Sequence, residues 1–243
     1  MINSTVDYIF SEWWLTFLFT FGFFMVLYFG GIFVMKTILY FLKKAGRVHA
    51  IVDFKKPGQE KVEIKNSMLS ILVFALQAIP LQLLYANGYF EFGQSGLLNL
   101  LWEIPILYLW NEIYFYASHW LLHQPPFFMK VHYMHHASRE PTLYSVYSFH
   151  WFEAFLLGAV IFLPVLVYPF HILSVLSLPI MSILLNFLGH WNHEGDTTKS
   201  PDYLGRFTFR HTMHHKWSKG NFGFMLPYFD MIFNTATPKN KMK

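Results

Sequence analysis

The chain contains no cysteine, and charged residues make up only 13% of its 243 positions. Without cysteine there is no disulfide bond, no cysteine-ligated iron–sulfur cluster, no thiolate-ligated haem and no thiol nucleophile. A soluble globular chain has about 25% charged residues, so roughly half of the usual charge is missing. With 54% hydrophobic residues and a mean hydropathy of +0.33, the composition favours an integral membrane protein over a water-soluble domain.

The first two apolar stretches are long enough to cross a membrane. Residues 13–42 contain a single charged side chain, Lys36, and a helix of that length at about 1.5 Å per residue exceeds a bilayer's thickness. The segment before it carries acidic residues and no Lys or Arg, so we do not expect a cleavable signal peptide. A second apolar run, 67–85, follows a polar and basic stretch at 43–66.

Two further membrane segments are expected. Residues 97–122 predict a third helix, which is apolar except for Glu103, Asn111 and Glu112. Carboxylates at that depth are costly and usually face a protein interior or a wet cavity. Residues 151–187 are again apolar, but three prolines interrupt them. We therefore expect two short antiparallel helices that turn near residues 168–170.

Basic residues are confined to alternate connections. Residues 1–12 and 86–96 contain no Lys or Arg, whereas 43–66 contain seven, 123–150 two and 191–243 eight. The positive-inside rule places these three basic segments on the cytoplasmic face. The prediction is an all-α, integral membrane four-helix bundle with an outside N-terminus and a cytoplasmic C-terminus.

The localisation that follows is a multi-pass membrane protein whose C-terminus faces the cytoplasm. The ending, 239–243, has lysines at alternate positions and resembles a dilysine-type retrieval signal. We therefore expect the endoplasmic reticulum for a eukaryotic chain and the inner membrane for a bacterial one.

Histidine is strongly clustered, since eight of the thirteen fall in three five-residue windows. The windows are His119-Trp120-Leu121-Leu122-His123, His132-Tyr133-Met134-His135-His136 and His211-Thr212-Met213-His214-His215. On a helix, positions i, i+3 and i+4 share one face, so each window projects two or three imidazoles in one direction. All three windows lie in segments predicted to be cytoplasmic, so eight imidazoles are expected on the same side of the membrane.

This pattern is typical of metal ligands. A neutral imidazole binds Fe, Zn, Cu and Ni, and one ion takes about three or four protein ligands. Eight imidazoles therefore indicate two metals in a histidine-lined cap. Imidazole does not itself select iron over zinc, but a metal pair beside an acyl-chain-sized apolar volume suits O₂ activation and attack on an unactivated C–H bond. A charged interfacial patch or a pH sensor is the alternative interpretation.

The five remaining histidines are interpreted separately. His190 is predicted to be a further ligand, because a helix should re-emerge there on the same side as the windows. His193 and His150 are left open, each as a ligand or an ordinary residue, His150 as a helix-start residue. His49 and His171 are interpreted as ordinary core or surface residues.

The order HxxxH, HxxHH, an isolated histidine in a GHxxH-like segment and a second HxxHH resembles the fatty acid hydroxylase/sterol desaturase superfamily of membrane di-iron oxygenases. Downstream, 220–223 resembles the family's glycine–asparagine turn. Residues 229–235 resemble its W-D-x-x-F-G-T ending, with Phe229 in place of Trp and Asn234 in place of Gly. The resemblance covers about 102–237.

The resemblance implies that nine histidines hold two irons that activate O₂. They are His119, His123, His132, His135, His136, His190, His211, His214 and His215. It also divides the chain into 1–96, with N-terminal transmembrane helices and a basic cytoplasmic loop, and 97–243, a fatty acid hydroxylase-like catalytic region. We expect no catalytic side chain beyond the metal ligands and no organic cofactor.

The expected function is O₂-dependent hydroxylation or desaturation of a lipid, such as a fatty acyl chain or a sterol, that enters laterally from the bilayer. The chain has no dinucleotide fingerprint and no cysteine, so a separate cytoplasmic electron donor is implied. A cytochrome b5-like protein or a ferredoxin would serve. Five basic residues are candidates for docking the donor or for contacting anionic lipid headgroups: Lys199, Arg206, Arg210, Lys216 and Lys219.

Three other functions were weighed against this one. A zinc-dependent membrane hydrolase would need HExxH, which the sequence does not contain. A histidine-rich metal transporter or metal-binding protein without redox catalysis would place its site near the membrane midplane, whereas these histidines are predicted at one face. Nucleic-acid binding is disfavoured, because the basic residues follow membrane topology.

Two carboxylates near the predicted ligands, Glu112 and Asp230, have roles that the sequence suggests. Glu112 shares a helix face with His119 and His123, so it would either orient a ligand histidine or pair with a neighbouring polar side chain. Asp230 is expected to cap or anchor the terminal segment rather than bind metal.

Overall fold

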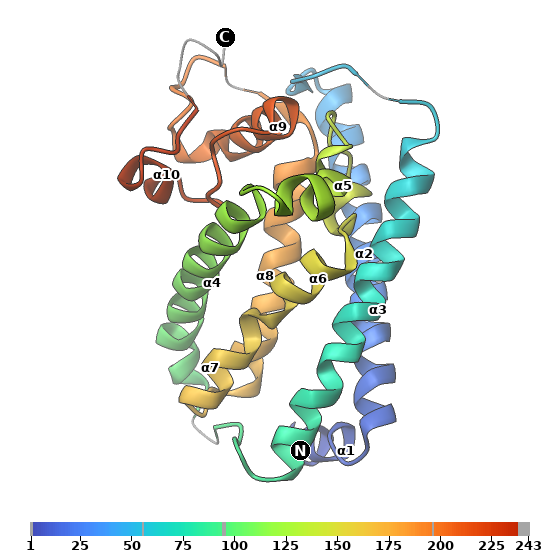
Figure 1. Cartoon of the computed structure of the whole chain (residues 1–243), viewed down its shortest axis with the longest axis vertical. Coiled ribbons are helices and arrows are strands. Elements are labelled where there is room, and N and C mark those ends of the chain that lie inside the picture. Colours follow the sequence, from blue (N-terminus) through green and yellow to red (C-terminus); the bar gives the residue numbers. More distant parts are fainter. Residues whose placement is uncertain (1, 55, 94–95, 196, 238–243) are drawn as a thin grey trace.

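The computed structural model describes residues 2–54, 56–93, 96–195 and 197–237. The tail at 239–243, with its retrieval-like lysines, lies outside these ranges, as does Lys55 of the basic loop. The described residues are mostly helical, and the long helices run along the longest axis of the molecule (Figure 1). The all-α class expected from the sequence is therefore confirmed.

Three helices are long and apolar enough to cross a membrane. They are α2 (Trp13–Lys44), α3 (Gln59–Ala86) and α8 (Ile172–His190). The predicted membrane helix over 97–122 forms as α4 (Leu100–Leu122), but it is not among the helices that are apolar enough over a membrane-spanning length. Its three polar residues, Glu103, Asn111 and Glu112, are buried within the protein, where a polar group is stable only with partners.

Helix α3 begins eight residues before the predicted position of 67. Gly58, with φ of +76°, ends the preceding loop in the left-handed region that glycine adopts freely. The first two turns of α3 are polar, and Gln59 and Glu63 on them are nevertheless buried. The polar stretch was interpreted as a solvated loop, but its side chains are hydrogen-bonded to other parts of the protein, which stabilises a helix there.

The expected pair of helices in 151–187 is present, but only the first arm is short, because α8 has 19 residues and is long enough to cross a membrane. Helices α6 (Trp151–Gly158) and α7 (Phe162–Val167) are followed by a turn at 168–171 and then by α8. Pro179 lies inside α8 without ending that helix. The chain reverses direction between α7 and α8, in the segment that contains Pro169. His150 and His171 are the N-caps of α6 and α8, where each Nδ1 accepts a backbone N–H two residues on.

Two small elements were not predicted. Helix α1 (Ile2–Ile9) packs at the end of the bundle that also holds the start of α2 (Figure 1). Strands β1 (His49–Ala50) and β2 (His193–Glu194) pair antiparallel, with His49 opposite Glu194. This pairing ties the loop after α2 to the segment after α8.

Four of the remaining short helices gather at the end of the bundle opposite α1 (Figure 1). They are a π-helical turn at Phe128–His132, α5 (Tyr133–His136), α9 (Phe207–Trp217) and α10 (Tyr228–Ile232). The C-terminal ends of α4 and α8 reach the same region. All three histidine windows therefore meet at one end of the molecule.

Close packing of α2 against α8 depends on Gly31. A Cβ atom at this position would lie 2.2 Å from the ring of Phe187, which is fully buried. We expect Gly31→Leu to lower the free energy of unfolding by about 1–3 kcal/mol through overpacking. Thermal unfolding in detergent measures the effect. Gly30→Leu is the matched control, because nothing lies within 4 Å of a Cβ there, and equal melting temperatures for the two variants would contradict this account.

Candidate metal centre

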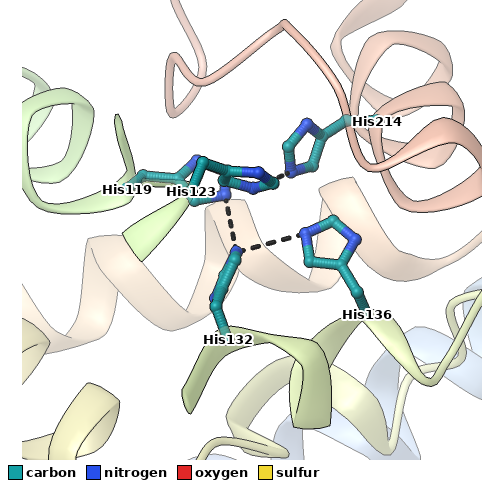
Figure 2. A group of neighbouring side chains, drawn as sticks. All are labelled: His119, His123, His132, His136 and His214. Atoms are coloured by element: carbon teal, nitrogen blue, oxygen red, sulfur yellow. Dashed lines mark hydrogen bonds between the residues drawn. The ribbon is translucent and has the colours of Figure 1, made fainter. Parts of the chain in front are cut away.

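The nine histidines predicted as ligands converge in two groups. The first is formed by His119, His123, His132, His136 and His214, and the second by His135, His190, His211 and His215. Within each group, one nitrogen from every histidine lies within 4.8 Å of the others. Figure 2 shows the first group, in which the rings from α4, the 128–136 segment and α9 face one another. His150 and His193, left open by the sequence, belong to neither group.

Each HxxHH window contributes to both groups. The expectation that a window projects all its imidazoles in one direction therefore holds for positions i and i+4, whereas the i+3 histidine belongs to the other group. His132 and His136 enter the first group while His135 enters the second. In α9 the assignment is reversed, with His211 and His215 in the second group and His214 in the first. The two groups are therefore adjacent and share their supporting helices.

The spacing of the ring nitrogens fits one metal ion in each group. In the first group, Nε2 of His132 lies 3.1 Å from Nε2 of both His119 and His136. In the second group, Nε2 of His211 lies 2.8 Å from Nε2 of His190 and 3.2 Å from Nε2 of His215. Nitrogens bound to one ion at about 2.1 Å are separated by roughly 3.0 Å in octahedral and roughly 3.4 Å in tetrahedral geometry.

Hydrogen bonds outside the groups determine which nitrogen carries the proton. Nδ1 of His119 and His215 faces the carbonyls of Phe222 and Ser138 at 2.8 and 3.1 Å. A carbonyl only accepts, so Nδ1 is the donor and Nε2 is left with a lone pair pointing inward. The same holds for His214, whose Nδ1 donates to the Gly220 carbonyl. Lone pairs facing each other at these distances are stable only around a cation, which is the chemical reason that the site fits a metal.

Burial keeps these imidazoles neutral. The pKa values of His132, His135, His136, His211, His214 and His215 are lowered well below the ordinary value by desolvation, and neighbouring imidazoles lower them further. A histidine must be neutral to bind a metal through nitrogen. The centre therefore presents unprotonated ligand atoms at neutral pH.

Asp230 holds the turn that supports two of the ligands. Its carboxylate accepts the backbone N–H groups of Phe222 and Gly223, each at 2.8 Å, and the Thr235 hydroxyl at 2.7 Å. Gly220 and Asn221 in this turn both have positive φ, which suits glycine and asparagine. Asp230 thus anchors the terminal segment, as the sequence predicted, and fixes the carbonyls that receive His119 and His214.

Glu112 does not orient a ligand. It accepts the backbone N–H groups of Met225 and Leu226 at 3.1–3.2 Å and a hydrogen bond from the Tyr108 side chain. Of the two roles considered, pairing with a polar side chain is therefore the one that the structure supports, and the two backbone donors were not expected. The residue that does contact a histidine is Glu153, whose Oε1 lies 2.8 Å from Nδ1 of His132. Sequence analysis missed this role, although Glu153 is the one carboxylate in the apolar stretch 151–187.

Two of the five basic residues proposed for docking are not available for it. Arg206 is only 9% exposed and forms a bidentate ion pair with Glu194. Arg210 is buried and donates to the carbonyls of Pro201, Tyr203 and Met225. The docking prediction is wrong for these two, because each guanidinium is satisfied inside the protein, whereas Lys199, Lys216 and Lys219 are exposed.

An apolar cavity of about 400 Å³ adjoins the histidines. It follows α8 from Ile172 to Asn186, which corresponds to about 21 Å of helix. Four residues line both this cavity and a small pocket against His119, His132, His135 and His211; they are Phe115, Phe149, Leu157 and Asn186. The cavity and the small pocket beside the histidines therefore share these four lining residues and lie next to each other.

Comparisons with known proteins agree with this geometry. Delta(7)-sterol 5(6)-desaturase of Candida dubliniensis is 30% identical over 187 residues, which cover 73% of this chain and 47% of that protein. Human lathosterol oxidase is 27% identical over 186 residues, which cover 70% of this chain and 61% of that protein. C-4 methylsterol oxidase of Schizosaccharomyces pombe is 27% identical over 153 residues, which cover 60% of this chain and 50% of that protein.

The chain spans about half the length of the yeast sterol desaturases that it matches. No solved structure matches it significantly. The fatty acid hydroxylase family model matches residues 104–235, which is more than half of the chain and includes all nine histidines of the two groups. The chain belongs to the fatty acid hydroxylase family.

Proposed function

We propose that the chain is a membrane di-iron oxygenase that uses O₂ to hydroxylate or desaturate a C–H bond of a lipid, such as a sterol or a fatty acyl chain. One observation carries this proposal. Nine histidines, eight of them buried, form two adjacent ligand groups at the end of an apolar cavity within the helical bundle.

The proposed ligand sets are the two histidine groups, with one ion in each. Imidazole binds several metals, and iron is favoured here because the relatives are named as desaturases and oxidases, which carry out redox reactions. Bound in these groups, iron would supply the activation of O₂ and the removal of hydrogen from the substrate. The same residue pattern in a transporter would not require an apolar cavity beside the ligands.

The chain's own residues prepare the site for that chemistry. Glu153 and the carbonyls of Phe222, Gly220 and Ser138 hold the ligand tautomers. Where the cavity adjoins the small pocket beside the histidines, it is lined by the apolar side chains of Phe115, Phe149 and Leu157. These side chains would exclude water and orient an apolar substrate toward the histidines. The substrate would enter the cavity laterally from the bilayer.

The proposed membrane topology is a multi-pass four-helix arrangement of α2, α3, α4 and α8, with α6 and α7 embedded beside them. The positive-inside rule supports a cytoplasmic location for the histidine end. Within this arrangement, 1–96 would supply transmembrane helices and the basic loop, and 97–243 the catalytic region. The membrane would be the endoplasmic reticulum in a eukaryote and the inner membrane in a bacterium.

A separate electron donor, such as a cytochrome b5-like protein or a ferredoxin, completes the proposal. Helix α9 carries three of the ligands and ends at Trp217, which is 51% exposed. Lys216 and Lys219 beside it are exposed as well. Lys216, Trp217 and Lys219 closely follow His214 and His215 in the sequence. The positive charge of the two lysines favours an acidic donor.

The proposal is tested with one ligand variant from each group. We expect purified wild-type protein to hold two irons per chain and to support O₂-dependent oxidation of membrane lipids. His135→Ala and His214→Ala should each remove about one iron and abolish turnover, because each leaves its group a ligand short. Metal analysis and lipidomics provide the two readouts. Unchanged iron content and turnover in both variants would refute the assignment, and bound iron without O₂ consumption would favour a metal-binding protein.

Removal of the Glu153 carboxylate tests whether its contact with His132 contributes to metal binding in the first histidine group. We expect Glu153→Ala to weaken metal binding or activity by about 10–100-fold, because partners of ligand histidines have effects of this size. Metal titration of the purified variant measures the loss. Phe155→Ala is the control on the same helix, since its side chain is 50% exposed and does not line the centre. Equal metal affinity in the two variants would show that Glu153 has no such role.

Filling the cavity separates substrate binding from metal binding. Ala78 lines the cavity and is 9% exposed, so Ala78→Phe should displace a bound lipid and lower turnover by about 100-fold. Iron content should stay at the wild-type level. Leu76→Phe is the matched control, because Leu76 lies two residues earlier on α3 and faces outward at 49% exposure. Wild-type turnover in Ala78→Phe would exclude this cavity as the substrate site.

A further inference from the structure

Glu63 is a buried carboxylate on α3, in a part of the chain that the family model does not match. It is 1% exposed and accepts three side-chain hydrogen bonds. The donors are Gln59 Nε2 at 2.7 Å, Ser138 Oγ at 2.7 Å and Thr142 Oγ1 at 2.6 Å. Among the described residues no Lys or Arg forms an ion pair with it. Burying a carboxylate with only neutral hydrogen-bond donors costs folding free energy, so we asked which other groups its hydrogen bonds position.

The first path from Glu63 leads to His215. The Ser138 hydroxyl donates to Oε1 of Glu63, and the carbonyl of the same residue accepts Nδ1–H of His215 at 3.1 Å. Ser138 is itself buried. The carboxylate therefore fixes the residue whose backbone determines the tautomer of a histidine in the second group.

The second path leads to His190. The Thr142 hydroxyl donates to Oε2 of Glu63, and the backbone of Thr142 is bound to Ser145 in both directions. Since the Ser145 hydroxyl donates to the Thr142 carbonyl at 2.7 Å, its oxygen accepts Nδ1–H of His190 at 2.8 Å. Nε2 of His190 is then left with its lone pair toward His211, which lies 2.8 Å away.

We propose that Glu63 is a positioning residue for the second histidine group, acting on His215 through Ser138 and on His190 through Thr142 and Ser145. This inference rests on the proposed function, since it assigns Glu63 a role in holding one of two metal ions. It also gives α3 a part in the centre, although α3 supplies no ligand.

The first group is supported by different residues. His119 and His214 donate to carbonyls of the turn that Asp230 holds, and His132 pairs with Glu153. In the described parts of the chain, no hydrogen bond links Glu63, Ser138 or Thr142 to these three histidines. Loss of Glu63 should therefore affect one metal ion and spare the other, which a general loss of stability would not do.

The experiment compares three variants of the full chain, purified in detergent and loaded with iron. Glu63→Leu removes the acceptor for both hydroxyls, and we expect the iron content to fall from two ions per chain to one. Glu63→Gln should retain two, because its amide oxygen still accepts from Ser138 and the Thr142 hydroxyl can accept from its NH₂ group. Glu103→Leu is the matched control for loss of a buried carboxylate. Glu103 is fully buried and binds Ser174 and the His171 N–H, but it lies 16 residues before His119, about 24 Å along α4.

A second readout does not depend on metal. In the metal-free protein, Glu63→Leu should increase carbethoxylation of His190 and His215 by diethyl pyrocarbonate, measured by peptide mass spectrometry, while His119 and His214 react as in wild type. Two irons in Glu63→Leu, or equal loss from both groups, would overturn the role of Glu63. If wild-type protein holds no iron, the proposed function fails, and selective labelling of His190 and His215 still decides whether Glu63 positions them.

Discussion

The whole candidate centre depends on one constraint, which is that each imidazole able to bind a metal must direct an unprotonated nitrogen inward. An imidazole achieves this when its other nitrogen donates to an acceptor on the outside. The protein supplies such acceptors from distant parts of the chain. They include the Phe222 and Ser138 carbonyls, the Glu153 carboxylate and the Ser145 hydroxyl.

This constraint explains why the loops around the centre are anchored by buried carboxylates. Asp230 holds the turn at 220–223, and Glu63 holds the loop that begins at Ser138. Glu112 holds a third segment, at Met225 and Leu226. Each carboxylate accepts several donors at once, so one side chain fixes a whole turn. Asn234, which replaces a family glycine, has φ of +55° and keeps the left-handed conformation that asparagine tolerates.

Helix geometry connects the cavity to the histidines. On α4, Asn111, Phe115 and His119 are four residues apart, and on α8 Ser182, Asn186 and His190 repeat this spacing. Residues at i, i+4 and i+8 lie along one helix face, so each helix carries a line of cavity residues that ends at a ligand. In the proposed function, a lipid bound in the cavity would lie between these two lines of residues.

The helical class, the approximate positions of the apolar helices and the gathering of nine histidines at one end could be predicted from the amino-acid order. These predictions use apolar run length, the placement of basic residues and the 3.6-residue period of a helix. The division of the nine histidines between two groups, and the residues that support them, became apparent in the folded chain alone. Glu63 and Glu153 lie 75 and 21 residues from their partners Ser138 and His132, and no local pattern encodes such contacts. The polar first turns of α3 were interpreted as a loop for the same reason, because their stability comes from partners that the folded chain brings to them.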